Sequence, residues 1–204
     1  GGVGSFAAEF IARAGVGKMT IVDGDVVDPT NRNRQLPALA TNHGLSKADI
    51  MADRLRAINP EIELHVVKSF IEPEMVAELI ALKPDYIIDA IDSITPKITF
   101  IREAYGAGLP LVCSMGAGGK LDPTALRVVD ISKTYNCAFA QQVRKQLKPF
   151  GIYKGIDAVF SPEKSNKASL ILTDGSNYKK SAYGTISYLP ATFGAVVASV
   201  VIRK

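Results

Sequence analysis

Residues 1–23 read GGVGSFAAEFIARAGVGKMTIVD, and this stretch already indicates how the chain folds. Its apolar side chains recur from Phe6 onward at the three- and four-residue spacing of a helix, and residues 19–23 form a short apolar run typical of a buried strand. A glycine-rich turn that opens a helix normally follows a strand, and here the chain begins with the turn itself. We therefore expect that the natural protein has a first strand upstream of Gly1.

The same alternation of helix and strand continues outward from this stretch. Ser46 is placed to cap the next helix and Pro60 to stop it. The further expected segments are a strand over residues 62–67, a helix over 73–82, a strand over 85–92, a helix over 96–105 and a strand over 109–114. Alternating helices and strands predict an α/β fold with a doubly wound, mainly parallel, Rossmann-like sheet.

The regular alternation fades after residue 115. We expect a glycine loop over residues 116–119, a strand over 126–131, a helix over 138–147, a strand over 168–173 and a closing apolar helix over 190–202. Neither a linker nor a repeat interrupts the chain. The sequence therefore predicts a single domain over residues 1–204, with a core over about residues 1–115 and an elaborated C-terminal region over about residues 116–204.

Composition and charge exclude several classes of protein. Hydrophobic residues make up 47% of the 204 residues and charged residues 22%, which is typical of a globular protein rather than a disordered chain, a collagen or a coiled coil. Every apolar run is shorter than the roughly 20 residues that cross a bilayer, so we expect no transmembrane segment. The 24 Lys and Arg against 20 Asp and Glu give a net charge of +4. This mild excess permits a polyanionic partner such as RNA without requiring one.

The glycine turn is the first candidate site. Backbone N–H groups at the start of a helix point outward, and the helix dipole favours an anion there. Gly2 and Gly4 would let a phosphate approach the backbone closely. Asp23 ends the following strand, where a dinucleotide fold places the carboxylate that binds ribose hydroxyls. A tight structural turn and a capping or ion-paired carboxylate are the alternative interpretations.

Charged residues after the strands extend this candidate site. Arg34 and Lys47 follow Asp23 in the chain, where cations would meet the β- and γ-phosphates of a nucleotide. Asp92 lies at the carboxyl end of a later strand, the edge at which open α/β sheets bind ligands, and a carboxylate there can hold Mg²⁺. Asp89 has the simpler interpretation of a buried, hydrogen-bonded carboxylate. Each residue alone could be structural, but together they predict a nucleotide phosphate site.

These residues lie in motifs that resemble the ThiF/MoeB superfamily, which includes the ubiquitin-activating enzymes. The motifs are Gly-Gly-Val-Gly-Ser at 1–5, Ala-Gly-Val-Gly at 14–17, Asp23-x-Asp25, Asn31-x-Asn33-Arg34-Gln35, Lys47, Ile58-Asn59-Pro60 and Asp89-x-x-Asp92. Members adenylate a carboxylate with Mg-ATP, usually as homodimers. The resemblance implies an ATP-binding core over about residues 1–115 and a substrate or dimer region over about residues 116–204.

The resemblance also implies roles for individual residues. Residues that would contact ATP are Gly2, Gly4, Asp23 at the ribose, Asn33, Arg34 and Lys47 at the phosphates, Asp92 and Ser93. Arg34, Lys47 and Asp92 are the expected catalytic residues, and Asp92 is the expected Mg²⁺ ligand.

A second set of motifs resembles the branch of this superfamily that dehydrates threonylcarbamoyladenosine in tRNA. The set comprises Asp89-Ala-Ile-Asp-Ser followed by Pro96-Lys97, and further matches at residues 116–119, 122–124, 133–134, 159–163 and 191–194. This branch implies an ATP-dependent dehydratase that cyclises the modified adenosine, with tRNA as its partner. It also implies a homodimer, a monovalent cation (K⁺ or Na⁺) and a sulfur-relay protein partner. We expect a cytoplasmic location, with peripheral membrane association left open.

Three other functions are alternatives. Adenylyl transfer to the C-terminal glycine of a sulfur-carrier or ubiquitin-like protein would use the same ATP site and commonly a transfer thiol. Cys113 falls in an expected buried strand and Cys137 in a loop or helix start, and two cysteines cannot form a four-cysteine zinc site, so we expect no zinc. An NAD-dependent dehydrogenase would use Asp23 but gives no reason for Arg34 and Lys47. A nucleotide-binding module without catalysis would need none of these charges.

Overall fold

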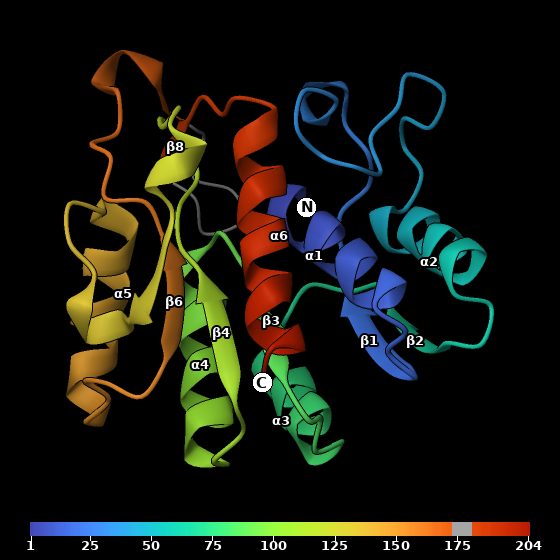
Figure 1. The fold of residues 1–204 in the computed structure, drawn as a ribbon, viewed down its shortest axis with the longest axis horizontal. Coiled ribbons are helices and arrows are strands. Elements are labelled where there is room, and N and C mark those ends of the chain that lie inside the picture. The colour runs from blue at the N-terminus through green and yellow to red at the C-terminus, as the bar shows by residue number, and fades with distance from the viewer. Residues whose placement is uncertain (173–180) are drawn as a thin grey trace. The chain divides into compact units, whose positions relative to one another are not determined.

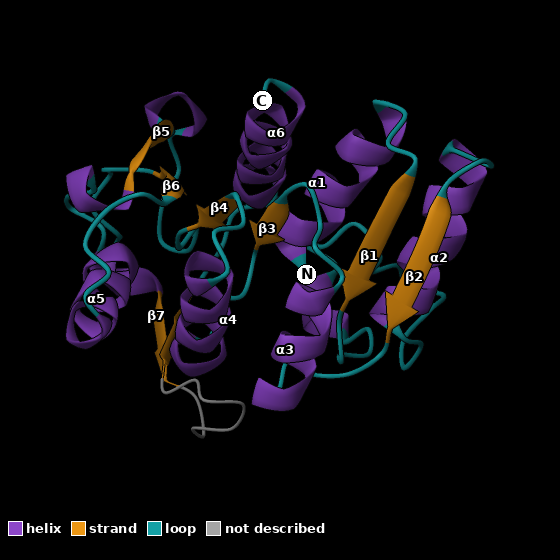
Figure 2. Cartoon of the chain, turned by 90° about the horizontal axis from the view of Figure 1, so that it is seen from below, coloured by secondary structure: helices purple, strands orange, loops and turns teal. Residues whose placement is uncertain are grey.

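The structure is a computed structural model that describes residues 1–172 and 181–204. It separates into two compact units, residues 1–71 with 190–204 and residues 72–189, and each is described by itself. Figure 1 labels their helices and most of their strands, and Figure 2 labels β5 and β7. From α1 to β4 the helices and strands alternate in chain order, as the sequence predicts for an α/β fold. The expected single domain stays a prediction.

The first unit is built on two parallel strands, β1 (Lys18–Val22) and β2 (Glu63–Val67). Its helices are α1 (Gly2–Arg13), α2 (Lys47–Ile58) and most of α6 (Tyr188–Ile202). Helix α2 packs against both strands and against α1. Figure 2 shows α2 next to β2. The buried side chains of Ala12, Met51, Leu55 and Ile62 form the core between them. The apolar stripe of α2 therefore covers the strand pair, as its periodicity predicts.

An ion pair also joins α1 to α2. Arg54 Nε donates to Glu9 Oε2 at 2.6 Å, and Arg13 Nη2 lies 2.8 Å from Glu9 Oε1 one turn along the same helix. The hydrogen bond from Arg54 lowers the pKa of Glu9 and raises that of Arg54. The carboxylate is therefore ionised at neutral pH and holds the two helices together.

Helix α6 approaches the first turns of α1 so closely that its contact residue must be a glycine. A Cβ on Gly194 would lie 2.7 Å from the carbonyl oxygen of Val3, 2.8 Å from Cβ of Phe6 and 3.0 Å from the nitrogen of Ala7. Two of these three atoms belong to the backbone and cannot rotate away. Figure 1 shows the start of α1 next to α6.

The second unit contains a four-stranded sheet in the order β3-β4-β6-β5. Strands β3 (Ile87–Asp89), β4 (Leu111–Ser114) and β6 (Asp157–Phe160) are parallel, and β5 (Arg127–Asp130) is antiparallel to β6. The helices of this unit are α3 (Pro73–Ala81), α4 (Ile94–Gly106) and α5 (Ala138–Leu147). Strands β7 (Leu170–Leu172) and β8 (Ser181–Tyr183) form a separate antiparallel pair. The mainly parallel sheet is thus confirmed.

Several expected segments differ from the structure. The expected strand over residues 85–92 is only Ile87–Asp89, and α4 begins at Ile94 rather than at residue 96. Strand β6 was not expected, because its last three residues are all buried and lack the polar–apolar alternation that marks a half-buried strand. Of the expected strand over residues 168–173, residues 170–172 form β7, and residue 173 lies outside the described residues.

Replacing Gly194 tests the contact between α6 and α1. Gly194→Ala should destabilise the protein by about 1–3 kcal/mol, the usual cost of overpacking a dense interior. Gly106→Ala is the matched control, because Gly106 also lies in a helix but its added Cβ would meet nothing within 4 Å. Thermal unfolding should show a lower Tm for Gly194→Ala alone. Equal Tm values for both variants would contradict the close approach.

Candidate nucleotide site

The glycine turn lies at the start of α1. Helix α1 begins at Gly2, and the capping position is Gly1, which has no side chain to satisfy the first N–H groups of the helix. A Cβ on Gly2 would lie 3.1 Å from Cβ of Pro190 and 3.4 Å from the carbonyl oxygen of Arg34. The turn is therefore a narrow cradle of backbone that a side chain would fill. Gly4 lies in the first turn of the same helix.

Asp23 joins the glycine turn to the end of β1. The N-terminal ammonium group of Gly1 forms an ion pair with Asp23 Oδ2 at 2.9 Å. The backbone nitrogen of Asp25 donates to Asp23 Oδ1 at 3.0 Å. Gly24 lets the distant segment at Ser69 and Phe70 pass close by, since a Cβ on Gly24 would lie 2.5 Å from the nitrogen of Phe70. The structure thus brings together the glycine turn and the carboxylate that the sequence predicts at the strand end.

Lys47 is fixed beside the same loop. Its side chain is only 4% exposed, and its Nζ lies 2.8 Å from Asp25 Oδ2. Its backbone nitrogen donates to the carbonyl oxygen of Asp25 at 3.0 Å. Ser46 caps α2 by accepting from the nitrogen of Asp49 at 3.3 Å, as the sequence predicts. The cation is therefore held in place at the N-terminus of α2.

Arg34 and Asn33 lie together after a short 3₁₀ helix, η1 (Pro29–Asn31). Arg34 Nη1 donates to Asn33 Oδ1 at 2.9 Å and to the carbonyl oxygen of Thr30 at 3.0 Å. Asp28 caps η1, and its hydrogen bonds from Thr30 lower the pKa of its carboxyl group. The guanidinium of Arg34 is thus oriented by the loop that carries it.

Asp92 and Ser93 belong to the second unit and follow β3. Asp92 is exposed, Ser93 is the capping residue of α4, and Ser93 Oγ donates to Asp92 Oδ1 at 3.5 Å. The position of Asp92 differs from the expected one, because the strand ends at Asp89 and Asp92 lies in the loop beyond it. The metal-binding role of Asp92 stays a prediction.

Asp89 is a buried carboxylate, as its simpler interpretation proposed. Its side chain is fully buried, and its Oδ2 lies 2.8 Å from Nζ of Lys97, which is also fully buried. Lys97 Nζ donates further to the carbonyl oxygens of Ile91 at 3.1 Å and Ser114 at 3.0 Å. Lys97 therefore ties the loop that carries Asp92 to the end of β4.

Sequence reasoning assigned no role to Lys97, although a signal was present. Lys97 lies on the apolar face of its helix with Ile98, Ile101 and Ala104, all of which are buried. A lysine on the buried face of a helix and a carboxylate inside the apolar run of the preceding strand are both charges removed from water. Such charges are rarely buried unless they are paired, so the two residues were candidates for an ion pair.

Lys120 is a second buried lysine of this unit. Its Nζ donates to the carbonyl oxygen of Ser161 at 2.6 Å, and burial lowers its pKa. Cys113 and Cys137 are both buried, and Cys137 is the capping residue of α5. Burial and the nearby charge of Asp89 raise the pKa of the Cys113 thiol well above its ordinary value, so it is protonated at neutral pH. Neither thiol lies in the exposed loop that a nucleophile would need.

Within residues 1–172 and 181–204, the structure contains no group of three or more His, Cys, Asp or Glu side chains placed to hold a metal ion. In the same part of the chain, no helix has both the length and the apolar character needed to cross a membrane. Magnesium ions in nucleotide-binding proteins are usually held by one or two protein carboxylates and the phosphates of the nucleotide, so a larger cluster of carboxylates is not required. Asp92 offers one such carboxylate.

The fold is that of a mainly parallel α/β protein, and a comparison with known families identifies the family to which it belongs. The chain matches the ThiF family over residues 1–204 and belongs to that family.

Relatives with curated names extend this finding. The chain is 40% identical over 221 residues to the tRNA threonylcarbamoyladenosine dehydratase of Escherichia coli, covering 100% of this chain and 82% of that protein. It is 47% identical over 163 residues to the dehydratase of the same name in Bacillus subtilis, covering 80% of this chain and 64% of that protein. The crystal structure of the E. coli dehydratase in complex with ATP is similar to this chain with a TM-score of 0.89 at 41% identity, covering 100% of this chain and 81% of that one.

The buried ion pair can be tested by removing one charge or both. Lys97→Met should destabilise the protein by about 3–5 kcal/mol, because it leaves the Asp89 carboxylate buried without a partner. The double variant Lys97→Met, Asp89→Asn should lose less than Lys97→Met alone, since the remaining charge is also removed. The free energy of unfolding in urea measures both, with the exposed Lys83→Met as control. A Lys97→Met variant within about 0.5 kcal/mol of the wild type would contradict the pairing.

Proposed function

We propose that this protein is an ATP-dependent dehydratase that cyclises threonylcarbamoyladenosine in tRNA. The observation that carries the proposal is its likeness, over the whole chain, to the E. coli dehydratase of that name, whose structure contains ATP. ATP as the co-substrate is supported by the polar contacts in the first unit, which link the glycine turn to Asp23, Asp23 to Asp25 and Asp25 to Lys47.

The proposed reaction begins with activation of a carboxylate. The threonine carboxylate of the modified nucleoside attacks the α-phosphorus of ATP, an O–P bond forms, and the bond from the α-phosphorus to pyrophosphate breaks. The product is an acyl-adenylate with AMP as a good leaving group. Preorganised cations stabilise the charge that develops on the phosphates during this step.

Ring closure completes the reaction. The carbamoyl nitrogen or oxygen of the same nucleoside attacks the activated acyl carbon, the bond to AMP breaks, and one proton leaves the attacking group. The nucleoside has then lost one water, whose oxygen is carried by AMP. Because both reacting groups belong to one molecule, the step gains from proximity and needs no protein nucleophile. The burial of both cysteines is consistent with such chemistry.

We assign residues to these steps as follows. The backbone of the turn at Gly2 and Gly4 binds phosphate oxygens, and Asp23 accepts hydrogen bonds from ribose hydroxyls. The remaining contacts come from Asn33, Arg34 and Lys47 at the phosphates and from Asp92 and Ser93. Arg34 and Lys47 act as the cations of the transition state.

Magnesium bound by Asp92 and the phosphates would neutralise charge on the departing pyrophosphate. Asp92 is suited to this because it is exposed and lies in a loop that Lys97 holds through Ile91.

Adenylyl transfer to a sulfur-carrier protein fits less well. The E. coli and B. subtilis dehydratases match 100% and 80% of this chain at 40% and 47% identity, while the E. coli molybdopterin-synthase adenylyltransferase matches 67% of it at 29%. A transfer reaction would also favour an exposed thiol, and both cysteines of this chain are buried. The homodimer, the monovalent cation, the absence of zinc, the sulfur-relay partner and the cytoplasmic location stay predictions.

Product analysis tests the proposal. The full-length protein, incubated with ATP, Mg²⁺ and tRNA that carries the modified nucleoside, should release AMP and pyrophosphate in equal amounts. Mass analysis of the digested tRNA should show the nucleoside lighter by one water. A protein ending in Gly-Gly should not replace tRNA in promoting AMP release. ADP and phosphate as the only products with tRNA would overturn the proposal.

Variants of the charged residues test the assigned site. Lys47→Ala removes a phosphate cation and Asp92→Asn a metal-ligand charge, and each should lower turnover about 10²- to 10³-fold per folded molecule. Lys18→Ala and Asp85→Asn are matched controls, because both residues are exposed and have no assigned role in the site. Rates are measured at saturating ATP after circular dichroism has established the folded fraction. Near-wild-type turnover in either test variant would remove that residue from the site.

A further inference from the structure

We infer that residues 127–154 form a binding surface for unpaired RNA nucleotides, with a pocket at the start of α5 that takes one base. The inference rests on the proposed function in one respect, namely that tRNA is the source of the RNA. It goes further by assigning a place on this chain to the nucleic acid.

The positive charge of the protein is concentrated in this segment. Residues 127–154 contain six Lys and Arg and one acidic residue, whereas the whole chain has a net charge of only +4. The rest of the chain therefore has no net positive charge. Five of the six cations are exposed, namely Arg127, Lys133, Lys145, Lys148 and Lys154. Clustered, exposed cations are the electrostatic signature of a nucleic-acid contact.

The elements that carry these cations lie together in the second unit. Helix α5 packs against η3 (Ile131–Lys133) and η4 (Lys148–Phe150), the short 3₁₀ helices on either side of it in the chain. Arg144 of α5 is hydrogen-bonded through Nη1 to the carbonyl oxygen of Thr134 at 2.9 Å and to its hydroxyl. Helix α5 and the residues on either side of it in the chain are therefore packed together.

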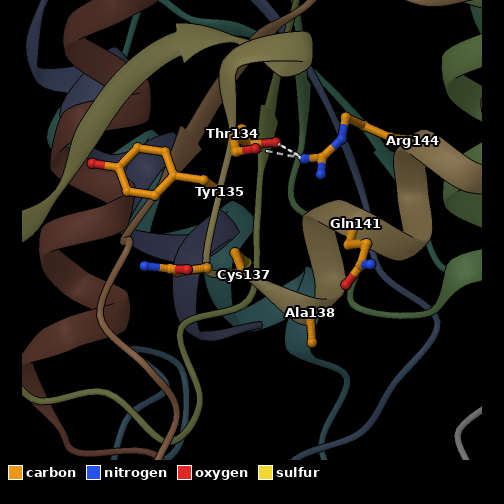
Figure 3. A pocket seen from close by; sticks show the side chains of 7 residues that line it. Thr134, Tyr135, Cys137, Ala138, Gln141 and Arg144 are labelled. Carbon is orange, nitrogen blue, oxygen red and sulfur yellow. Dashed lines mark hydrogen bonds between the residues drawn. The ribbon is translucent and has the colours of Figure 1, made fainter.

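A pocket of about 390 Å³ opens in this surface at the start of α5. Its lining is more polar than apolar and is formed by Thr134, Tyr135, Asn136, Cys137, Ala138, Gln141 and Arg144. Figure 3 shows Arg144 and Gln141 extending from α5, with Arg144 reaching Thr134, and Tyr135 extending from the segment before the helix. All these residues belong to the second unit.

Tyr135 provides an aromatic surface at this pocket. Its ring meets the ring of Phe160 edge-on, with centroids 5.6 Å apart, and the guanidinium of Arg127 lies 5.8 Å from its centroid. These contacts hold the ring, yet Tyr135 remains 44% exposed. A fixed and exposed aromatic ring beside cations is what single-stranded nucleic acids use for stacking.

The other lining groups match the polar edge of a base. The exposed amides of Asn136 and Gln141 each offer a donor and an acceptor. Asn136 has a positive φ of 52°, a conformation that most non-glycine residues avoid. An acidic protein would use the cations but would have no need for amides and an exposed ring at the same place. These observations favour RNA over an acidic protein as the occupant.

Binding of RNA alone tests the charged surface. The probe is a fluorescent RNA stem–loop with an unpaired loop, titrated at several salt concentrations. The variant Lys133→Ala, Lys145→Ala should bind the RNA more weakly. Its plot of log K against log salt should also be less steep, with a slope less negative by about 1.4, or about 0.7 for each lost phosphate contact. Lys83→Ala, Lys164→Ala changes the net charge equally at exposed sites outside the segment and should keep the wild-type slope. Equal effects of the two pairs would overturn the inference, as would equally tight binding of a poly-glutamate peptide.

Substitutions at two positions, Tyr135 and Asn136, test the pocket itself. Tyr135→Ala should weaken binding of the RNA about 10-fold, while Tyr135→Phe should keep most of the affinity, because the stacking surface remains. Asn136→Gly removes the amide and relieves the positive φ, so it should not weaken the fold but should bind RNA several-fold more weakly. If Asn136→Gly and Tyr135→Ala, both folded, bind RNA as the wild type does, the pocket takes no base.

Turnover separates this inference from the proposed function. With tRNA and ATP, the Lys133→Ala, Lys145→Ala variant should show a raised KM for tRNA, with an unchanged KM for ATP and an unchanged kcat. An unchanged KM for tRNA in an active enzyme would overturn the binding surface and leave the dehydratase reaction standing. A wild-type protein that binds the RNA but never releases AMP would instead overturn the proposed function alone.

Discussion

The ion pair between Lys97 and Asp89 is the interaction on which the second unit depends. Both side chains are fully buried, and a charge taken out of water is costly unless a partner and further hydrogen bonds compensate it. Lys97 meets that condition through the carboxylate and the carbonyl oxygens of Ile91 and Ser114. One side chain therefore joins α4, the end of β4 and the loop that follows β3. The same contacts set the loop of Asp92 at the carboxyl end of the strands, where open α/β sheets bind their ligands.

In the first unit, segments that are distant in sequence are joined by close approach of their backbones. Gly194 lets α6 touch the first turns of α1, and Gly24 lets the loop after β1 pass the segment at Phe70. In the same unit the glycine turn meets the end of β1, where the N-terminal ammonium group of Gly1 pairs with Asp23. A short chain of hydrogen bonds then runs through Asp25 to Lys47. Polar groups that are far apart in sequence thereby form one cluster.

Charge is divided along the chain in a way that fits two kinds of anion. The first unit places a few cations, each held by neighbouring groups, beside a glycine turn, which suits a compact triphosphate. Residues 127–154 instead carry many exposed cations with exposed aromatic and amide groups, which suits a flexible polyanion with bases. An enzyme that spends ATP on a nucleoside within tRNA needs both. Both cysteines are buried, which agrees with ring closure inside the substrate.

The sequence by itself determined the α/β class, the order of elements from α1 to β4, and the candidates at the glycine turn, Asp23 and Lys47. These follow from periodicity, capping residues and motif spacing, which are local properties of the chain. Tertiary structure alone showed that β6 lies between β4 and β5, that the strand carrying Asp89 ends before Asp92, and that Lys97 pairs with Asp89. Strand order and the partner of a buried charge depend on segments far apart in sequence, and a residue's own neighbours in the chain do not specify them.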